Sequence, residues 1–427
     1  MEVYNYSDLT KSDIAKLAQR NVDPANEIRA IVEEVITNVQ QHGDSALFDY
    51  AEKFDKVKLD KLYLDKDELI EIASAVSTEQ KAALETAYNN IYKFHKTQLK
   101  TEDKVETMPG VTCWRELRPI EKVGLYIPGG TAVLPSTLLM LGIPARIAGC
   151  HEIVVCTPPQ KDGKVNAFVA YVLLLLDIDK IYLAGGSQAI AAMAYGTESV
   201  TKVDKIFGPG NQFVTKAKTI IQSTTTTAID MPAGPSEVLV IADETAKSEY
   251  IGADLLAQAE HGIDSQAILV CTSQKIADAT LTAIEHQLSV LPRADIAKQA
   301  LDNSYIVITN TLDEAMQFSN QYAPEHLILA TVNWQLLTTN IVNAGSVFLG
   351  NLTPESVGDY ASGTNHTLPT SSYARAYSGV SVDSFVKKIT FQHITPEGIK
   401  NIGPTVEILA ELEGLMAHKS AVTIRMK

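Results

Sequence analysis

The stretch EVLVIADETAKSEYIGADLLAQAEHGIDSQAILVCT, residues 237–272, decides the fold of this 427-residue chain. Two short apolar runs rich in β-branched residues, Glu237–Ala242 and Gln266–Thr272, flank a window with helical spacing at Ser248–Glu260. This alternation is typical of a strand–helix–strand unit, which joins two parallel strands by a right-handed crossover. The stretch therefore predicts an α/β protein in which helices cover both faces of a parallel sheet.

The same alternation extends in both directions and predicts two similar modules. Helical windows such as Thr137–Ala148 and Leu312–Tyr322 separate the apolar runs. The predicted strands are Val123–Ile127, Glu152–Cys156, Lys180–Leu183, Lys205–Phe207 and Thr226–Ile229, then Glu237–Ala242, Gln266–Thr272, Tyr305–Thr309, His326–Ala330 and Ser346–Leu349. Five strands over 123–235 and five over 236–370 indicate two Rossmann-like modules with parallel sheets. A duplication would explain the likeness, although residue identity alone does not reveal one.

The two ends of the chain differ from the modules. Over residues 1–122 the windows Asn26–Phe54 and Thr78–Leu99 predict a helical N-terminal segment, which we expect to pack on the second module. Residues 371–427 form a small tail with a strand-like run and a final helix that ends near His418. A tail of this size cannot build a core of its own, so it must pack on the modules or on another subunit.

The composition excludes several classes of protein. Hydrophobic residues make up 45% and charged residues 20%, as in globular enzymes rather than disordered or fibrous chains. The formal net charge of −15, from 36 basic and 51 acidic residues, argues against a nucleic-acid partner. The longest apolar run, Ala167–Leu176, is too short to span a membrane, and no signal peptide is visible. Because the four cysteines are scattered without a CxxC pair, we expect a reducing, cytoplasmic location.

Several polar residues suit a metal ion. Gln258 and His261 are three apart on a predicted helix, so they lie on one face within reach of a single ion. The alternative is a polar helix end, with Gly262 as its cap. Asp359 and His366 lie in a long Gly-containing loop, and such loops often carry function, although a polar surface loop is the simpler reading.

Glu325 and His326 stand together at the entry to an apolar strand. A histidine held by a neighbouring carboxylate is suited to act as a general base near neutral pH, and a solvated turn is the alternative. Glu413 and His418, at the end of the last helix, indicate by themselves only a capped terminus.

One mixed ligand set can be drawn from these positions. Gln258, His261, Asp359 and His418 offer nitrogen and oxygen donors without a thiolate, which suits zinc or another borderline divalent ion. The four residues lie far apart in the sequence, so their spacing alone does not bring them together.

Three glycine turns in the first module are typical of phosphate binding at a helix N-terminus. They are Tyr126-Ile-Pro-Gly-Gly130, Ala184-Gly-Gly-Ser-Gln188 and Phe207-Gly-Pro-Gly-Asn211. The Rossmann fingerprint G-x-G-x-x-G is absent, and each turn taken singly fits a tight strand-to-helix connection equally well. Three turns in one module favour a nucleotide there.

These segments, in this order, resemble the histidinol dehydrogenase family from about Val123 to the C-terminus. The motifs that carry the resemblance are Tyr126-Ile-Pro-Gly-Gly-Thr-Ala, Pro232-Ala-Gly-Pro-Ser-Glu-Val-Leu, Leu255–Gly262, Tyr322–Leu327, Gly358–Thr370 and Glu413-Gly-Leu-Met-Ala-His-Lys. Two departures, Leu134 in place of an aromatic residue and Thr364 in place of a proline, concern only loop geometry.

The resemblance implies an oxidation of L-histidinol to L-histidine through L-histidinal, with two NAD used in succession and one zinc ion per subunit. It implies zinc ligands at Gln258, His261, Asp359 and His418, and a base at His326 beside a water-activating Glu325. Substrate contacts are implied for these zinc ligands and for Ser236, His326, His366 and Glu413. Those to NAD are implied for Tyr126, Gln188 and Asn211.

The resemblance also implies a homodimer in which each tail completes the partner's site, with no nucleic-acid or membrane partner. A covalent cysteine mechanism is the less favoured route, because Cys150 and Cys156 lie in apolar surroundings that raise a thiol's pKa and make it inert. Two rival functions stay open. One is a metal-dependent hydrolase that uses Glu325 and His326, and the other is a two-lobed metal- or ligand-binding module.

Overall fold

Parallel strands form at all ten places where the apolar runs predict them. The computed structural model describes residues 1–20, 26–129, 134–232 and 234–427. The strands of the first module are β5 (Lys122–Tyr126), β6 (Glu152–Thr157), β7 (Ile181–Leu183), β8 (Lys205–Phe207) and β9 (Ala228–Ile229). Those of the second are β10 (Glu237–Ala242), β11 (Gln266–Cys271), β12 (Tyr305–Ile308), β13 (His326–Ala330) and β14 (Ser346–Leu349). The predicted α/β class is confirmed.

The two sheets have the same topology. Their strand orders are β2-β7-β6-β5-β8-β9 and β1-β12-β11-β10-β13-β14. Leaving out the first strand of each list, both follow the order 3-2-1-4-5, and all the pairs within those five strands are parallel. The edge strands differ, because β2 (Tyr63–Leu64) runs antiparallel to β7 whereas β1 (Glu2–Asn5) runs parallel to β12. Two modules of one topology are therefore present, as the alternating pattern predicts.

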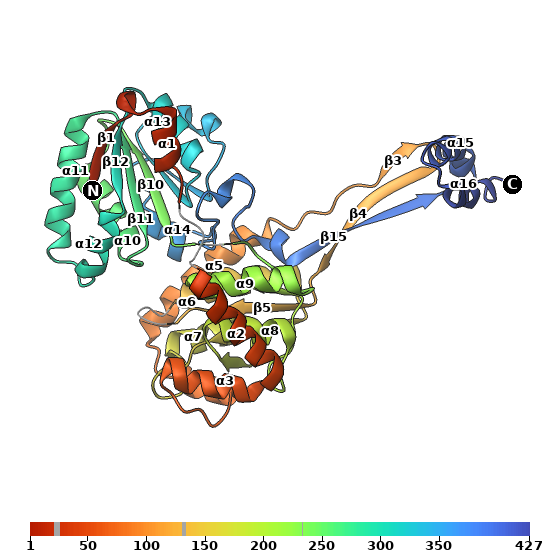
Figure 1. Ribbon diagram of the computed structural model, residues 1–427, viewed down its shortest axis with the longest axis horizontal. Helices are drawn as coiled ribbons and strands as arrows, with labels where there is room; N and C mark the ends of the chain where they lie inside the picture. Colours follow the sequence, from red (N-terminus) through yellow and green to blue (C-terminus); the bar gives the residue numbers. More distant parts are fainter. Residues whose placement is uncertain (21–25, 130–133, 233) are drawn as a thin grey trace.

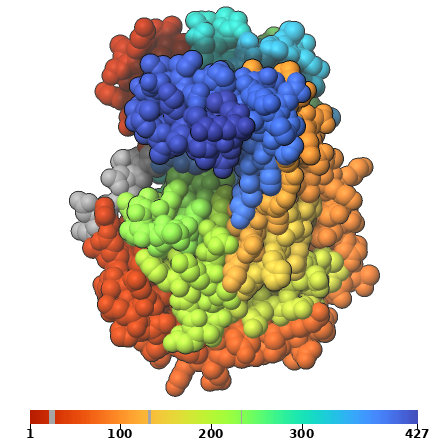
Figure 2. Space-filling model, turned by 90° about the vertical axis from the view of Figure 1, so that its right-hand side faces the viewer, coloured from red at the N-terminus to blue at the C-terminus, as the bar shows by residue number. Residues whose placement is uncertain are grey.

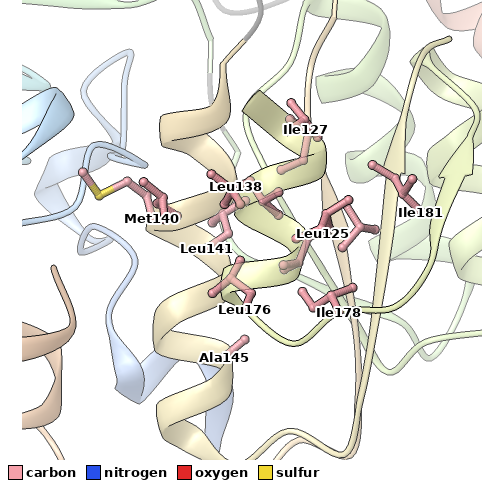
Figure 3. Packing of buried hydrophobic residues seen from close by; sticks show 14 of the residues in the cluster. Leu125, Ile127, Leu138, Met140, Leu141, Ala145, Leu176, Ile178 and Ile181 are labelled. Atoms are coloured by element: carbon pink, nitrogen blue, oxygen red, sulfur yellow. The ribbon is translucent and has the colours of Figure 1, made fainter. Parts of the chain in front are cut away.

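Helices cover both faces of each sheet, which explains why the strands are apolar at nearly every position. The helices of the modules are α6 (Pro135–Ala148), α7 (Ala167–Leu175), α8 (Gly186–Tyr195), α9 (Gln212–Thr224), α10 (Ser248–Ala259), α11 (Gln274–Leu288), α12 (Ala294–Asp302), α13 (Leu312–Tyr322) and α14 (Glu355–Tyr360). In the first module, Leu125 of β5 and Ile127 directly after it pack with Leu138 and Leu141 of α6 in one buried cluster (Figure 3).

The N-terminal segment divides between the modules, and the expectation that residues 1–122 pack on the second module is wrong for most of it. Among the described residues of this segment, those from β1 through α1 (Lys11–Leu17) to Arg20 lie on the second module, where Ile14 and Ala18 join its core and Arg20 contacts Glu237. Helices α2 (Asn26–His42), α3 (Asp44–Tyr50), α4 (Lys66–Ala73) and α5 (Thr78–Lys96) pack on the first module (Figure 1). An amphipathic stripe predicts that a helix is buried, but it does not say against which sheet.

The end of that segment is not helical either. Strands β3 (Val105–Met108) and β4 (Val111–Pro119) pair with β15 (Val386–Ile394) of the tail in an antiparallel sheet of order β15-β4-β3. This sheet forms an arm that carries α15 (Pro396–Leu412) and α16 (Met416–Thr423) away from both modules (Figure 1). The single final helix that the sequence predicts is instead broken at Gly414, whose φ is +71°. Viewed from its tip, the tail stands in front of the modules (Figure 2).

Candidate active site

Glu325 and His326 lie where the sequence places them, at the amino end of β13, which runs between β10 and the edge strand β14 of the second sheet. Both are buried, with 5% and 3% of their surface exposed. The main chain of Glu237, at the start of the neighbouring β10, contacts both side chains. Its N–H donates to Glu325 Oε2 at 2.9 Å, and its carbonyl oxygen lies 3.3 Å from His326 Nδ1. Because a carbonyl only accepts, this contact favours a proton on Nδ1.

The Glu237 carboxylate lies beneath this pair and is fully buried. Arg20 donates to it at 2.8 Å, the Tyr322 hydroxyl at 3.1 Å, and the Ser371 backbone N–H at 2.9 Å. Burial raises the pKa of Glu237, and the Arg20 guanidinium opposes that shift. Sequence reasoning misses Glu237 as a positioning residue, because one acid at the start of an apolar strand resembles a solvated strand end.

Three carboxylates surround the His326 ring. Asp359 Oδ1 lies 3.3 Å from Nε2, while Glu325 Oε2 and Glu355 Oε1 lie 3.8 Å and 3.9 Å from Nδ1. Glu355 and Asp359 are one turn apart on α14, so both face the ring. Burial alone would lower the pKa of His326, but the charges of Glu355, Glu325 and Asp359 raise it well above its usual value. Burial also raises the pKa of both Glu325 and Glu355 to about 8.

The residues around Asp359 fit a cation. Gln258, in the last turn of α10, is fully buried, and neither its amide oxygen nor its amide nitrogen has a hydrogen-bond partner in the described part of the chain. An unpaired buried amide is costly unless a ligand satisfies it. Helix α10 packs on α14, and the charge of Asp359 acts on the ring of His261 just beyond α10. Within the described ranges, His326, Glu355 and Asp359 present candidate ligand atoms that lie within 4.8 Å of one another.

Three of the four expected zinc ligands, Gln258, His261 and Asp359, lie on α10, just after it and on α14, which pack together, whereas the fourth lies elsewhere. His418 lies on α16 at the tip of the arm, where it and Glu413 are exposed. Glu355 is a candidate ligand or ring neighbour that sequence reasoning misses. Its spacing of four from Asp359 on a short helix is the signal that could have found it.

The site lies at the contact between the modules. Ser236 is half-buried directly before β10. His366 Nδ1 lies 2.8 Å from the Asp359 carbonyl oxygen, and its Nε2 lies 3.2 Å from the hydroxyl of Thr137, at the start of α6 in the first module. Burial lowers the pKa of His366 despite the nearby Asp359 carboxylate, which favours a neutral ring. His366 therefore links the charged cluster of the second module to the first module.

The predicted nucleotide residues gather around a cavity of about 780 Å³ at the carboxyl ends of β5, β6 and β7. This volume lies within the range of small-molecule sites. Tyr126 accepts a hydrogen bond from the Gly186 N–H at 3.0 Å, and Gln188 and Asn211 also line the cavity. Residues 130–132 of the first glycine motif lie outside the described residues.

A buried ion pair fixes the third glycine turn. Gly208 has a φ of +128°, and a side chain there would meet the carbonyl oxygen of Tyr126 at 2.2 Å. Lys218 donates to the Gly208 carbonyl oxygen at 2.9 Å, and the Gly208 N–H donates to Asp230 at 2.9 Å. Lys218 and Asp230 form an ion pair with only 3% and 1% of their side chains exposed. Both peptide groups beside Gly208 are thus held by one pair of charges, three residues before Asn211.

None of the four cysteines is placed as a nucleophile. Cys150, Cys156 and Cys271 are buried, and burial raises their pKa to about 11, 12 and 11. Cys113 lies on β4 of the arm. The three buried thiols are therefore protonated packing groups, in agreement with the sequence-based expectation for Cys150 and Cys156.

Comparison with known proteins identifies the family. The family model described as histidinol dehydrogenase matches residues 18–426. A histidinol dehydrogenase of Bacteroides thetaiotaomicron is 53% identical over 98% of this chain and 97% of its own length. One of Vibrio cholerae is 56% identical over 94% of this chain and 92% of its own length. The crystal structure of histidinol dehydrogenase from Elizabethkingia anophelis superimposes with a TM-score of 0.96 at 53% identity, covering 100% of this chain and 98% of that one. The chain belongs to the histidinol dehydrogenase family.

Proposed function

We propose that this protein oxidises L-histidinol to L-histidine through L-histidinal, using two NAD in succession. The observation that carries the proposal is the position of His366, which contacts Asp359 of the charged cluster and Thr137 of the first module. A substrate bound beside Asp359 therefore lies near the first module, where β5 and the cavity provide a place for a dinucleotide. In this proposal, residues 123–235 bind NAD and residues 236–370 carry zinc and the acid–base groups.

His326 is the base for the hydroxyl proton of the substrate. With Nδ1 directed to the Glu237 carbonyl, Nε2 is the atom that accepts the proton while hydride leaves the adjacent carbon. Because the surrounding carboxylates raise the pKa of the ring, Nε2 must first release its own proton, which a cation held by Asp359 would favour by offsetting that negative charge. Glu325 lies beside it with a raised pKa, which suits a carboxylate that takes a proton from water near neutral pH. That water hydrates the aldehyde before the second hydride leaves. NAD, when bound in the cavity, supplies the hydride acceptor.

The donor set fits a zinc ion. Gln258 offers an unpaired buried amide oxygen, Asp359 a carboxylate and His261 an imidazole, and such nitrogen and oxygen donors suit zinc. We assign the fourth position to His418 of the partner subunit. When bound, zinc would supply a Lewis acid for oxygen or a template for the imidazole and amine nitrogens of the substrate.

The arm supports a homodimer with shared active sites. Ile408, Leu412 and Ile424 of the tail expose 61%, 78% and 60% of their surface, and the arm holds them away from the modules of its own chain. Large exposed apolar residues on two helices that pack together, or directly after them, indicate an interaction surface. A second copy would cover them and would receive Glu413 and His418 in its substrate site.

No helix in the described residues could cross a bilayer. A biosynthetic reaction that consumes NAD fits the cytoplasm, which is the location that we propose.

The test is to follow the absorbance of NADH after L-histidinol and NAD are added. The proposal predicts two NADH per histidine formed, and loss of turnover when a chelator removes the metal. A folded, zinc-loaded protein that forms no NADH would overturn it and would favour a metal-dependent hydrolase or a two-lobed binding module.

A further inference from the structure

The cavity of the first module contains a carboxylate that the proposed mechanism leaves unused. Asp55 lines it, together with Tyr126, Gly186 and Gln188. Its Oδ2 atom is buried and has no hydrogen-bond partner among the residues that the structure describes. Buried acceptors are nearly always paired, so one that lines a cavity indicates a donor supplied by a ligand.

The backbone that presents Asp55 is unusual. The residue ends a π-helical turn, η2 (Ala51–Asp55), and Lys56 follows in the left-handed region with a φ of +61°. Single π-helical turns and left-handed residues other than glycine cost free energy and cluster at functional sites. Partial burial of its side chain raises the pKa of Asp55 to about 6 through desolvation.

The place of this turn in the fold indicates which part of a dinucleotide it would meet. The nicotinamide ring must point toward His326 in the second module for hydride transfer. The turn follows α3, on the side of the first module that is remote from the second (Figure 1). The adenosine half of the cofactor therefore lies nearer to Asp55. Its ribose carries hydroxyl donors, which an acceptor-only carboxylate can bind.

We propose that Asp55 accepts hydrogen bonds from the adenosine ribose hydroxyls and so selects a dinucleotide without a 2′-phosphate. This inference rests on the proposed function. A phosphate on that ribose would place a dianion against the half-buried Asp55 carboxylate and would remove the donor. Lys161 is the one Lys or Arg among the cavity-lining residues that the structure describes, and it is exposed at the rim.

The test compares Asp55→Asn with Glu52→Gln, which removes an exposed acid from the same turn outside the cavity. Dissociation constants for NAD and NADP are measured by calorimetry in the zinc-loaded protein, beside kcat and KM with L-histidinol. For Asp55→Asn we expect the dissociation constant of NAD and the KM for NAD to rise about tenfold, since a hydrogen bond to a charged group is lost. The preference for NAD over NADP should fall at least as much, with kcat nearly unchanged.

The melting temperature separates binding from folding. Removing the half-buried charge of Asp55 should leave the melting temperature unchanged or raise it. The inference would be wrong if Asp55→Asn weakened the binding of NAD and of NADP equally. It would also be wrong if the ratio of their dissociation constants were the same in Asp55→Asn as in Glu52→Gln. Asp55→Ser replaces Asp55→Asn if that variant does not fold. A wild-type protein that binds neither nucleotide would instead contradict the proposed function.

Discussion

The two modules share one strand order but place their functional groups at opposite edges of the sheet. In the first, glycine turns and the cavity lie at the carboxyl ends of β5, β6 and β7, where ligands of open α/β sheets usually bind. In the second, the buried acids and His326 lie at the amino ends of β10 and β13, while a smaller cavity of about 240 Å³ lies at the carboxyl ends of β13 and β14. The shared topology therefore gives each sheet two rigid ends at which a site can form. The residues at those ends determine which end carries the functional groups.

Each site is supported by a buried ion pair. Arg20 and Glu237 support the catalytic pair of the second module, and Lys218 and Asp230 hold the cofactor turn of the first. If the modules divide binding from chemistry, changes at the two edges should have separable effects on turnover and on NAD affinity.

The largest effect is expected from His326→Ala. Loss of a general base should lower kcat about a thousandfold or more, while the affinity for NAD measured by calorimetry stays unchanged. His286→Ala, an exposed histidine on α11 of the same module, is the matched control and should retain full turnover. A His326→Ala protein that binds NAD normally and turns over within tenfold of the wild type would contradict the assignment.

Next comes recovery of activity by mixing two inactive variants. A His418→Ala subunit and a His261→Ala subunit should together build one intact site per heterodimer. Random exchange would then restore about a quarter of wild-type activity. Gln258→Ala mixed with His261→Ala should recover nothing, because both changes lie in the same module. Zero recovery in the first mixture after confirmed exchange would argue against shared sites.

Breaking the ion pair of the second module should act mainly on turnover. Arg20→Met leaves Glu237 buried without its cation, which should cost about 3–5 kcal/mol in the free energy of unfolding. A shift of Glu237 would also misplace Glu325 and His326, so kcat should fall about tenfold at constant KM for NAD. Urea unfolding and steady-state kinetics measure both effects. An increase confined to KM for NAD would contradict this role.

Breaking the ion pair of the first module should act mainly on NAD binding rather than on turnover. Lys218→Met should raise KM for NAD about tenfold, because the Gly208 turn and Asn211 lose their support, with kcat much less affected. Lys218→Arg keeps the charge and should recover part of the NAD affinity, which a purely structural defect would not predict. Equal losses in kcat for both ion-pair variants would mean that the modules do not divide the work.

The smallest effects are expected at the cysteines. Because burial keeps Cys150, Cys156 and Cys271 protonated, replacing each with Ser should leave kcat within about twofold where the variant folds. The same is expected of Cys113 on the arm. A thousandfold loss in any folded single variant, about 4 kcal/mol in the barrier, would point to a covalent intermediate instead.

The sequence predicts features that depend on neighbouring residues better than features that depend on residues far apart in the chain. The ten strands are set by local apolar runs, and Glu325, His326 and Asp359 stand out because charges in such places are unusual. The partner of each N-terminal helix could not be predicted, since a stripe of apolar residues fits either sheet. Glu237 was missed because Arg20 and Ser371, which make its burial tolerable, lie far away in the chain. Asp55 was missed because its position in a cavity, which segments far apart in the chain build together, is visible only in the structure.

A crystal structure with zinc, L-histidinol and NAD would test the central claim most directly, with the metal located by anomalous scattering. We predict a metal peak bound by Gln258, His261, Asp359 and His418 of the partner subunit, with L-histidinol beside His326. NAD should fill the first-module cavity with its nicotinamide directed toward His326. A metal bound elsewhere, or NAD in the smaller cavity beside β13, would contradict the division of work between the two modules.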